Sequence, residues 1–505
     1  MKRILAIVLS VLCVSFAFAQ DSLTLRSTKS YLIADGSEKE MTFLKEKSRQ
    51  AGLDLGVSVL ANRVSTNSKH VSPKPSKHLL KQGILQLQLP MNENQDEFAV
   101  YHSELFDIPS TINVLQIDDE LITYRTMETT GNIHLLYHCV RGAFGTKKSA
   151  HAKNTPVYKF WDTPERTLLP DLELQDQMAQ SEAKKLAKTD FDLLIFNDLK
   201  SYAYNNHGDS AIGHFLDTMR KYNPDKLLQA DLLTPTSWHY LSRINENQVW
   251  NASMRTKIIE TLTKKQEFYG RAQMPWMIGN FQIFLADKNR KATSLEELEW
   301  ILSKAAAFDA GFGLICDVET MKKHGLTENF LNTINNWETL RLASAFSDEQ
   351  KEQFKDPYGD WHIEKDQDST YLLYTEHISR RFFSSFNDDH WEWNSPYESR
   401  FALLIAVEGK GSVNELDFNT PKGTLHFPCV LKANQYLVYD FDGSAYITDQ
   451  NFNKLEGVFP KGNAFLDEGT SEVSFSCEVK SQDNKPPQVT VRYITRSTPE
   501  VIRIQ

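Results

Sequence analysis

The chain has 505 residues, 41% of them hydrophobic, and a formal net charge of −10 at pH 7. This length is more than one hydrophobic core usually serves, so we expect two or three domains. A negative net charge does not favour binding to the phosphates of nucleic acid, so we expect no nucleic-acid partner.

Residues 1–19 have the three regions of a secretory signal peptide. Lys2 and Arg3 form a basic start, and residues 4–18 form an apolar run that is too short for a stable membrane span. Small residues occupy the −3 and −1 positions of a cleavage site before Gln20. We therefore expect export to the periplasm, the cell surface or the medium. No later stretch has the apolar length of a membrane span.

The chain after this segment begins as an alternation of strands and helices. Residues 30–34 and 53–60 are apolar runs, and residues 38–51 between them carry apolar side chains at spacings of three and four. A capping residue, Ser37, and a stop, Gly52, bound that predicted helix. Such a βαβ unit predicts a parallel sheet.

Residues 83–159 break this alternation and have the pattern of a small antiparallel β module. Short runs with period-2 patterning, such as residues 83–89 and 112–117, are separated by turn residues, and no helical stretch occurs among them. We expect this module to interrupt the first alternating unit.

The alternation returns after the module and persists to about residue 345. Helices are predicted at 172–188, 210–222, 294–308 and 328–345, with a helix-rich stretch at 237–268, and strands at 191–196, 226–231, 275–284 and 311–317. Together with the opening unit, six or seven strands alternate with helices. This pattern predicts an α/β fold, namely a (β/α)8 TIM-type barrel in which one strand is not placed. An open doubly wound sheet is the alternative, but no glycine-rich phosphate turn follows any strand.

Past residue 356 the pattern contains strands only. Runs of alternating or β-branched residues, separated by Asn, Gly and Pro turns, predict a C-terminal β-sandwich that folds separately from the barrel. The predicted division is residues 1–19, signal peptide; 20–82, first barrel units; 83–159, inserted β module; 160–356, remainder of the barrel; and 357–505, C-terminal β-sandwich.

The cysteines and histidines give no metal-binding pattern. None of the cysteines after Cys13 are spaced as a CxxC pair, and the histidines form no HExxH motif. We predict no metal and no other cofactor. Cys429 and Cys477 both lie in strand-like segments of the predicted sandwich, and the sequence leaves open whether they pair.

Acid and amide side chains follow the predicted barrel strands, where the active site of this fold lies. These residues are Asp35, Asn197, Asp198, Asp231, Asn280, Asp317 and Glu319. Hydrolysis of a glycosidic bond needs two carboxyl groups, one as acid and one as nucleophile or base. We therefore predict Asp198, Asp231 and Asp317 as catalytic residues. For each Asp singly, capping of the next helix is an equally good explanation.

Side chains able to bind a sugar accompany these acids. Trp238, His239 and Trp276 lie near predicted strand ends, although each ring taken singly is better explained as a core residue. Arg243, one turn after His239 on a predicted helix, could bind an acidic sugar or pair with a carboxylate. The predicted substrate-binding set is Asp35, Asn197, Trp238, His239, Arg243, Trp276, Asn280 and Glu319. No Gly-x-Ser-x-Gly elbow occurs, so we do not expect an esterase or protease.

Several stretches together resemble a family of exported glycoside hydrolases. They are residues 50–56, 71–75, 117–124, 139–146 with His151, 191–196, and Trp238-His239 with Ser242-Arg243. The similarity covers roughly residues 30–345, and the Arg-Gly-Ala-Phe-Gly-Thr element at 141–146 is its most recognisable part. The resemblance implies a barrel split by a β insertion and a C-terminal sandwich of the carbohydrate-binding sort.

The chain departs from that family at two places. The family's strand that ends here at Phe196 leads into Asp-Gly-x-Glu, whereas this chain has Asn197, Asp198 and then Lys200 in place of the Glu. Ser58 stands where the family carries a His. Because Asn cannot act as a carboxylate nucleophile, either Asp198 has taken over that role or the barrel binds sugar without cleaving it.

The sequence thus predicts an exported glycoside hydrolase-like protein that acts on an oligo- or polysaccharide. A non-catalytic glycan-binding protein on a degenerate glycosidase barrel is the alternative, and a structural or adhesive envelope protein is a third. The sequence does not name the sugar, the stereochemical outcome or the oligomeric state.

Overall fold

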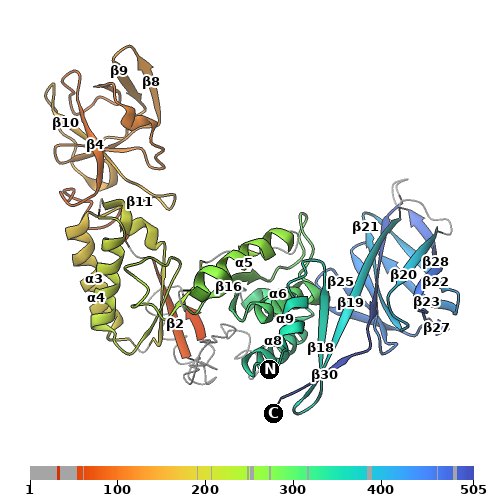
Figure 1. Ribbon diagram of the computed structural model, residues 1–505. Coiled ribbons are helices and arrows are strands. Elements are labelled where there is room, and N and C mark those ends of the chain that lie inside the picture. The colour runs from red at the N-terminus through yellow and green to blue at the C-terminus, as the bar shows by residue number, and fades with distance from the viewer. Residues whose placement is uncertain are drawn as a thin grey trace. The chain divides into compact units, whose positions relative to one another are not determined.

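The computed structural model describes residues 31–34, 54–60, 62–189, 191–205, 207–246, 249–250, 255–271, 274–315, 318–383, 389–462, 465–481 and 486–504 (Figure 1). The predicted signal peptide and the helix predicted at 38–51 lie outside these residues. The described residues divide into two compact units, which we call the N-terminal unit (33–34 and 55–244) and the C-terminal unit (31–32, 54 and 245–504). Within the described residues, no helix combines the length and apolar character needed to cross a membrane.

The N-terminal unit is built on a five-stranded sheet with the order β1-β2-β12-β13-β14. Its strands are β1 (Tyr31–Ala34), β2 (Asp54–Leu60), β12 (Leu193–Asn197), β13 (Leu227–Ala230) and β14 (Arg243–Ile244). Strands β2, β12, β13 and β14 are parallel, as the alternation predicts. The apolar side chains of β12 are buried, which is typical of a strand that is covered on both faces.

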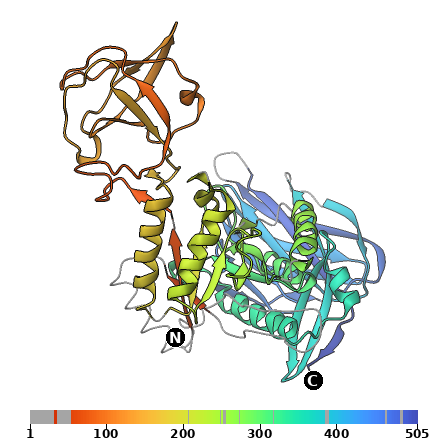
Figure 2. The same ribbon diagram turned by 60° about the vertical axis from the view of Figure 1, so that its left-hand side comes forward.

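Two helices lie side by side in this unit, α3 (Leu172–Leu186) and α4 (Asp209–Tyr222), and the short helix η3 (Leu199–Asn205) follows β12 (Figures 1 and 2). The Asp171 carboxylate caps α3 by accepting the Leu174 N–H at 3.0 Å. The observed bounds of both helices differ from the predicted ones by two residues or fewer.

Residues 81–160 contain strands and single-turn helices only. One antiparallel sheet has the order β4-β10-β6-β7, another has β5-β9-β8, and β3 pairs with β11 where the chain enters and leaves this region. The elements are β3 (Val64–Ser65), β4 (Lys81–Gln86), β5 (Phe98–Tyr101), η1 (Glu104–Asp107), β6 (Val114–Ile117), β7 (Glu120–Thr123), β8 (Thr126–Thr130), β9 (Ile133–Tyr137), η2 (Ala143–Gly145), β10 (Pro156–Phe160) and β11 (Thr167–Leu168).

The Arg-Gly-Ala-Phe-Gly-Thr element turns around a buried carboxylate. Glu120 accepts hydrogen bonds from Arg141 through Nε and Nη2, both at 2.8 Å, from the Gly142 N–H at 2.8 Å and from the Ser149 N–H at 3.0 Å. His151 Nε2 lies 2.9 Å from the same carboxylate. Gly142 has φ of 62°, and a Cβ there would lie 2.8 Å from a backbone oxygen, so this turn requires glycine.

The C-terminal unit begins with a three-stranded parallel sheet, β15-β16-β17. Its elements are β15 (Val249–Trp250), α5 (Arg255–Arg271), β16 (Met277–Gln282), α6 (Leu295–Ala307), β17 (Gly311–Ile315), α7 (Val318–Lys323), α8 (Thr327–Leu342) and α9 (Asp348–Gln353). The helix-rich stretch predicted at 237–268 is wrong in its first half. That half contains the two-residue strands β14 and β15, which are too short to show a period-2 pattern.

The parallel strands therefore belong to two separate sheets, of five and three strands. The mixed α/β character predicted from the sequence is present. Closure of these strands into one (β/α)8 barrel stays a prediction, because each sheet belongs mainly to a different compact unit.

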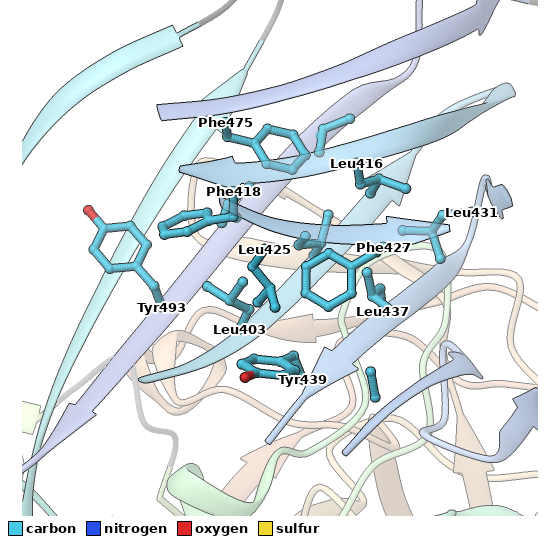
Figure 3. Close-up of a cluster of buried hydrophobic side chains, with 14 of the residues drawn as sticks. Leu403, Leu416, Phe418, Leu425, Phe427, Leu431, Leu437, Tyr439, Phe475 and Tyr493 are labelled. Carbon is cyan, nitrogen blue, oxygen red and sulfur yellow. The ribbon is translucent and has the colours of Figure 1, made fainter. Parts of the chain in front are cut away.

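The remaining residues form two antiparallel sheets with a shared core. One contains β18-β19-β29-β21-β24-β25-β26 with β30 beside β19, and the other β20-β28-β22-β23-β27. The strands are β18 (Asp360–Gln367), β19 (Thr370–Phe383), β20 (Asp389–Ser395), β21 (Phe401–Glu408), β22 (Gly411–Thr420), β23 (Gly423–Lys432), β24 (Gln435–Tyr439), β25 (Ala445–Asp449), β26 (Lys454–Val458), β27 (Lys461–Gly462), β28 (Gly469–Ser481), β29 (Gln488–Arg496) and β30 (Glu500–Arg503). Figure 3 shows side chains of both sheets, including Phe418, Phe427 and Leu437, packed against one another.

Two cysteines lie at the edge of this core without forming a disulfide. Cys429 and Cys477 are free, and both pack against the buried cluster. Burial raises the pKa of each thiol to about 11, so both are protonated at neutral pH.

Buried polar contacts join helix α6 to the first strand of the sandwich. The Glu299 carboxylate contacts His362 Nδ1 at 2.8 Å and accepts the Ile363 N–H at 3.3 Å. Burial alone would lower the pKa of His362, but the Glu299 carboxylate outweighs it and the pKa is raised to about 10. The Lys304 ammonium donates to the Asp356 carbonyl at 2.8 Å. These contacts link the helices of the C-terminal unit to its sandwich, and separate folding of the sandwich stays a prediction.

Candidate active site

The carboxyl ends of three neighbouring parallel strands meet at one edge of the five-stranded sheet. Asn197 at the end of β12 pairs with Leu60 at the end of β2, and Phe196 pairs with Ala230 at the end of β13. The residues that follow these strands are therefore neighbours, although they are far apart in sequence. We call this group, which comprises Arg63, Asp198, Asp231 and the contacting Glu165, the carboxyl-edge site.

Asp198 is paired with an arginine that the sequence analysis did not single out. Arg63 Nη2 forms an ion pair with Asp198 Oδ2, and the same nitrogen lies 3.3 Å from Glu165 Oε2. The side chains of Asp198 and Glu165 are 35% and 52% exposed, so solvent reaches both acids. Asp198 has φ of 63°, a left-handed conformation that Asp tolerates better than most residues do.

Asp231 holds the turn that carries Asp198. Its carboxylate accepts the Asp198 N–H at 2.5 Å and the Leu199 N–H at 3.1 Å. Burial raises the pKa of Asp231 against the lowering effect of these two amides, and the nearby Asp198 carboxylate raises it further. The two acids therefore have different surroundings, since Asp198 is ion-paired with Arg63 and is reached by solvent.

Glu165 is a second anionic group at this site. Hydrogen bonds from Thr163 and from its own backbone, together with the charge of Arg63, hold the pKa of Glu165 below its usual range. One arginine nitrogen therefore contacts both the Asp198 and the Glu165 carboxylates.

The two residues at which the chain departs from the family pattern lie beside Asp198. Asn197 ends β12 and is half-buried. Lys200 lies in η3 with an exposed side chain, so its ammonium remains in solvent and does not occupy a buried part of the site.

Two predicted sugar-binding residues, Trp238 and His239, are exposed on the segment between β13 and β14. The next residue, Tyr240, accepts a hydrogen bond from Arg220 Nη2 at 2.6 Å, and Arg220 Nη1 also binds the Lys226 carbonyl directly before β13. Residues 238–240 therefore lie near the amino ends of the strands, and the structure does not bring them to Asp198.

Arg243 lies in strand β14 and not on the helix that we predicted. Its side chain is buried, and Nε donates to Gln229 Oε1 at 2.5 Å. Gln229 belongs to the neighbouring strand β13, so the Arg243 guanidinium makes this contact within the sheet. The apolar residues around it gave no indication of a two-residue strand.

Trp276 and Asn280 belong to the C-terminal unit. Trp276 is buried, stacks on Tyr269 with ring centroids 5.7 Å apart, and precedes β16 at its amino end, so it is a core residue there. Asn280 lies within β16, and its Oδ1 accepts from Asn245 Nδ2 at 3.2 Å. A Cβ on Gly313 would lie 2.2 Å from that oxygen, which explains the glycine.

The structure does not describe the other predicted site residues. Asp35 and Asp317 lie outside the described residues. Glu319 is part of helix α7, but its side chain also lies outside them.

Arg63 and Glu165 are the members of the site that sequence reasoning missed. Arg63 follows β2 by three residues, and a search for basic as well as acidic residues after each strand would have found it. Glu165 lies in the connection that leaves the β module, where no periodicity marks it.

Comparison with known proteins gives weak structural likeness only. No protein-family model matches the chain, and no curated protein matches it. A β-L-arabinopyranosidase of glycoside hydrolase family 27 from Geobacillus stearothermophilus matches with a TM-score of 0.31 and 8% identity, covering 92% of this chain and 85% of that chain. A debranching enzyme from Nostoc punctiforme matches with a TM-score of 0.33 and 10% identity, covering 86% and 79%. Matches this weak do not decide the function.

Proposed function

We propose that this protein is an exported glycoside hydrolase-like protein that acts on a glycan through the carboxyl-edge site. The observation that carries the proposal is a pair of acids in unequal surroundings: Asp198 is ion-paired with Arg63 and reached by solvent, whereas burial raises the pKa of Asp231. A carboxyl group whose pKa is raised by burial, beside a second acid, is typical of a general acid.

The two acids have complementary roles in this proposal. Asp231 donates a proton to the oxygen of the leaving sugar, and Asp198 acts as nucleophile or base at the anomeric carbon. Arg63 positions Asp198, and the amide contacts of Asp231 fix the turn between them. Asp317 remains a third candidate acid from the sequence analysis.

The test is replacement of Asp198 by Asn, with Asp192→Asn as the matched control at the other end of β12. Asp192 is exposed and lies directly before the strand, so its loss removes the same charge without touching the site. On a panel of oligosaccharides, we expect Asp198→Asn to lower kcat at least about 1,000-fold with the melting temperature little changed. We expect Asp192→Asn to keep wild-type turnover. Full activity of Asp198→Asn would refute the assignment.

A non-catalytic glycan-binding protein is the second candidate, and one observation favours it. Both oxygens of Asp231 accept backbone N–H groups and Arg63 pairs with Asp198, so the site can also be a fixed binding surface. In that case wild-type protein releases no sugar from any glycan it binds, and Asp198→Asn leaves glycan affinity nearly unchanged in calorimetric titration.

Export is part of the proposal and rests on the sequence alone. If residues 1–19 are removed as a signal peptide, the mass of the protein recovered from outside the cytoplasm corresponds to a chain that starts at Gln20. An intact N-terminus on protein retained in the cytoplasm would contradict export.

A further inference from the structure

A cavity of about 650 Å³ lies in the N-terminal unit beside helix α3 and reaches the carboxyl-edge site. Polar and charged side chains line it, namely Asn62, Arg63, Lys69, His70, Glu182 and Lys185. Its volume is within the range of small-molecule sites, which is roughly 300 to 1,000 Å³. The proposed catalytic machinery does not use this space except through Arg63.

Two residues that line the cavity each carry a buried polar atom without a hydrogen-bond partner. The atoms are Asn62 Oδ1 and Arg63 Nε, and only 5% of Asn62 is exposed. Buried polar groups are usually hydrogen-bonded, so one acceptor and one donor beside the cavity have unused hydrogen-bonding capacity.

The charges around the cavity are mainly positive. Arg63, Lys69 and Lys185 contribute cations, and Glu182 is the acid that lines the same space, 3.5 Å from Lys185. Burial, followed by the charge of Lys69, lowers the pKa of His70, so that ring is neutral at pH 7. This balance favours an anionic ligand, although the whole chain is acidic.

Apolar side chains from two helices complete the wall. Met178 belongs to α3, and Phe215 and Met219 belong to α4. Carbohydrate sites combine such apolar surface, which contacts the C–H face of a sugar ring, with polar groups for its hydroxyls. The lining therefore fits a sugar ring that carries an acidic substituent.

We propose that this cavity binds an acidic sugar unit, a uronate or a sulfated sugar, of the glycan on which the carboxyl-edge site acts. The inference rests on the proposed function for the identity of the ligand as a glycan. Arg63 connects the two places, because it lines the cavity and its Nη2 contacts Asp198. Carboxylate and sulfate are both anions that a guanidinium binds in this way.

The experiment measures binding by calorimetry with the full processed chain carrying Asp198→Asn, which prevents turnover. The probes are a galacturonic acid oligomer and its neutral methyl ester, and a sulfated oligosaccharide and its desulfated form. We expect each acidic probe to bind about tenfold tighter than its neutral partner, with the preference falling as salt is raised from 0.05 to 0.5 M. The tighter of the two acidic probes tells carboxylate from sulfate.

Two double variants are compared. The test pair is Lys69→Gln with Lys185→Gln, and the control pair is Lys74→Gln with Lys184→Gln. Both pairs remove two charges from the same loop and the same helix, but Lys74 and Lys184 do not line the cavity. The first pair should lose the preference for acidic probes and keep its affinity for the neutral ones, and the second pair should retain the preference.

Equal affinity for the acidic and neutral probes, no binding of any probe, or tighter binding of a fatty acid anion would overturn the inference. The outcome is separable from that of the proposed function. Loss of hydrolysis in Asp198→Asn without an acidic preference leaves catalysis standing and removes the cavity assignment. A preference for acidic probes that depends on Lys69 and Lys185, found together with no hydrolysis by the wild-type protein, keeps the cavity assignment and removes catalysis.

Discussion

The Arg141–Glu120 and Arg63–Asp198 contacts of the N-terminal unit lie in opposite surroundings. In the β module, the side chains of Arg141 and Glu120 are 3% and 0% exposed. At the carboxyl edge, those of Arg63 and Asp198 are 13% and 35% exposed. Glu120 is surrounded by donors, whereas Arg63 retains a buried nitrogen without a partner.

The difference separates a contact that maintains the fold from one that can serve a ligand. A closed, fully hydrogen-bonded network gains nothing from a ligand, and losing one member leaves a buried charge alone. An open network with an unsatisfied donor can gain contacts when a ligand enters. The element that is most recognisable in the sequence therefore belongs to the structural contact, and the less recognisable residues belong to the candidate site.

The largest expected effect is on Arg141. Arg141→Met leaves Glu120 buried without its cation and should lower the free energy of unfolding by about 3 to 5 kcal/mol. Urea denaturation measures this, with Arg125→Met, an exposed arginine of the same module, as the control that should change stability by less than about 0.5 kcal/mol. A loss below about 1 kcal/mol for Arg141→Met would contradict a structural role.

The corresponding change at the site is Arg63→Met. Because water reaches Asp198, we expect a stability loss of no more than about 2 kcal/mol. Turnover should fall at least about 100-fold, since Asp198 loses the cation that positions it. Denaturation and steady-state kinetics on one preparation check both. If Arg63→Met left the kinetics unchanged and lost as much stability as Arg141→Met, both contacts would serve the fold alone.

Glu120 and Asp231, the buried acid beside the Arg63–Asp198 contact, should also respond to pH in opposite directions. Burial alone would raise the pKa of Glu120, but the hydrogen bonds from Arg141, His151 and two backbone amides lower it. Its stabilising contribution is complete above the ordinary Glu pKa and is lost as pH falls through the lowered folded-state pKa. The raised pKa of Asp231 contributes stability below the ordinary Asp pKa, and this is lost as pH rises through the folded-state pKa.

Carboxyl carbon chemical shifts, followed by NMR during a pH titration, test these directions. Asp231 should titrate above the usual Asp range and Glu120 below the usual Glu range. The spectrum of Asp231→Asn assigns the first signal. Titration of Asp231 within or below the usual range would remove the basis for its role as proton donor.

The smallest expected effect is on Lys200, the residue that reverses a charge relative to the family pattern. Its side chain is exposed, so Lys200→Glu should change the free energy of unfolding by less than about 0.5 kcal/mol and the melting temperature only slightly. A large stability change would show that Lys200 is part of the carboxyl-edge network. Lys188→Glu, also exposed, is the control for the change of charge alone.

Sequence reasoning found part of the site because polar residues after parallel strands converge whatever the intervening chain does. Asp198 and Asp231 follow β12 and β13, and the register brings them together as expected. It missed Arg63 because the contact with Asp198 spans 135 positions. It misplaced Trp276 because strand direction decides whether a residue beside a strand lies at its amino or its carboxyl end.

Outside the first half of residues 237–268, the sequence by itself indicated which of the described segments are helices and which are strands, since hydrophobic periodicity is a local property that burial on one face imposes. The bounds of α3, α4, α6 and β13 follow from it within about two residues. Only the tertiary structure decided which charges meet. Arg63, Glu165 and Asp198 converge because sheet order places β2 beside β12, and sheet order depends on packing between segments far apart in the chain. The same packing decided which arginine is buried with every donor satisfied and which one faces a cavity.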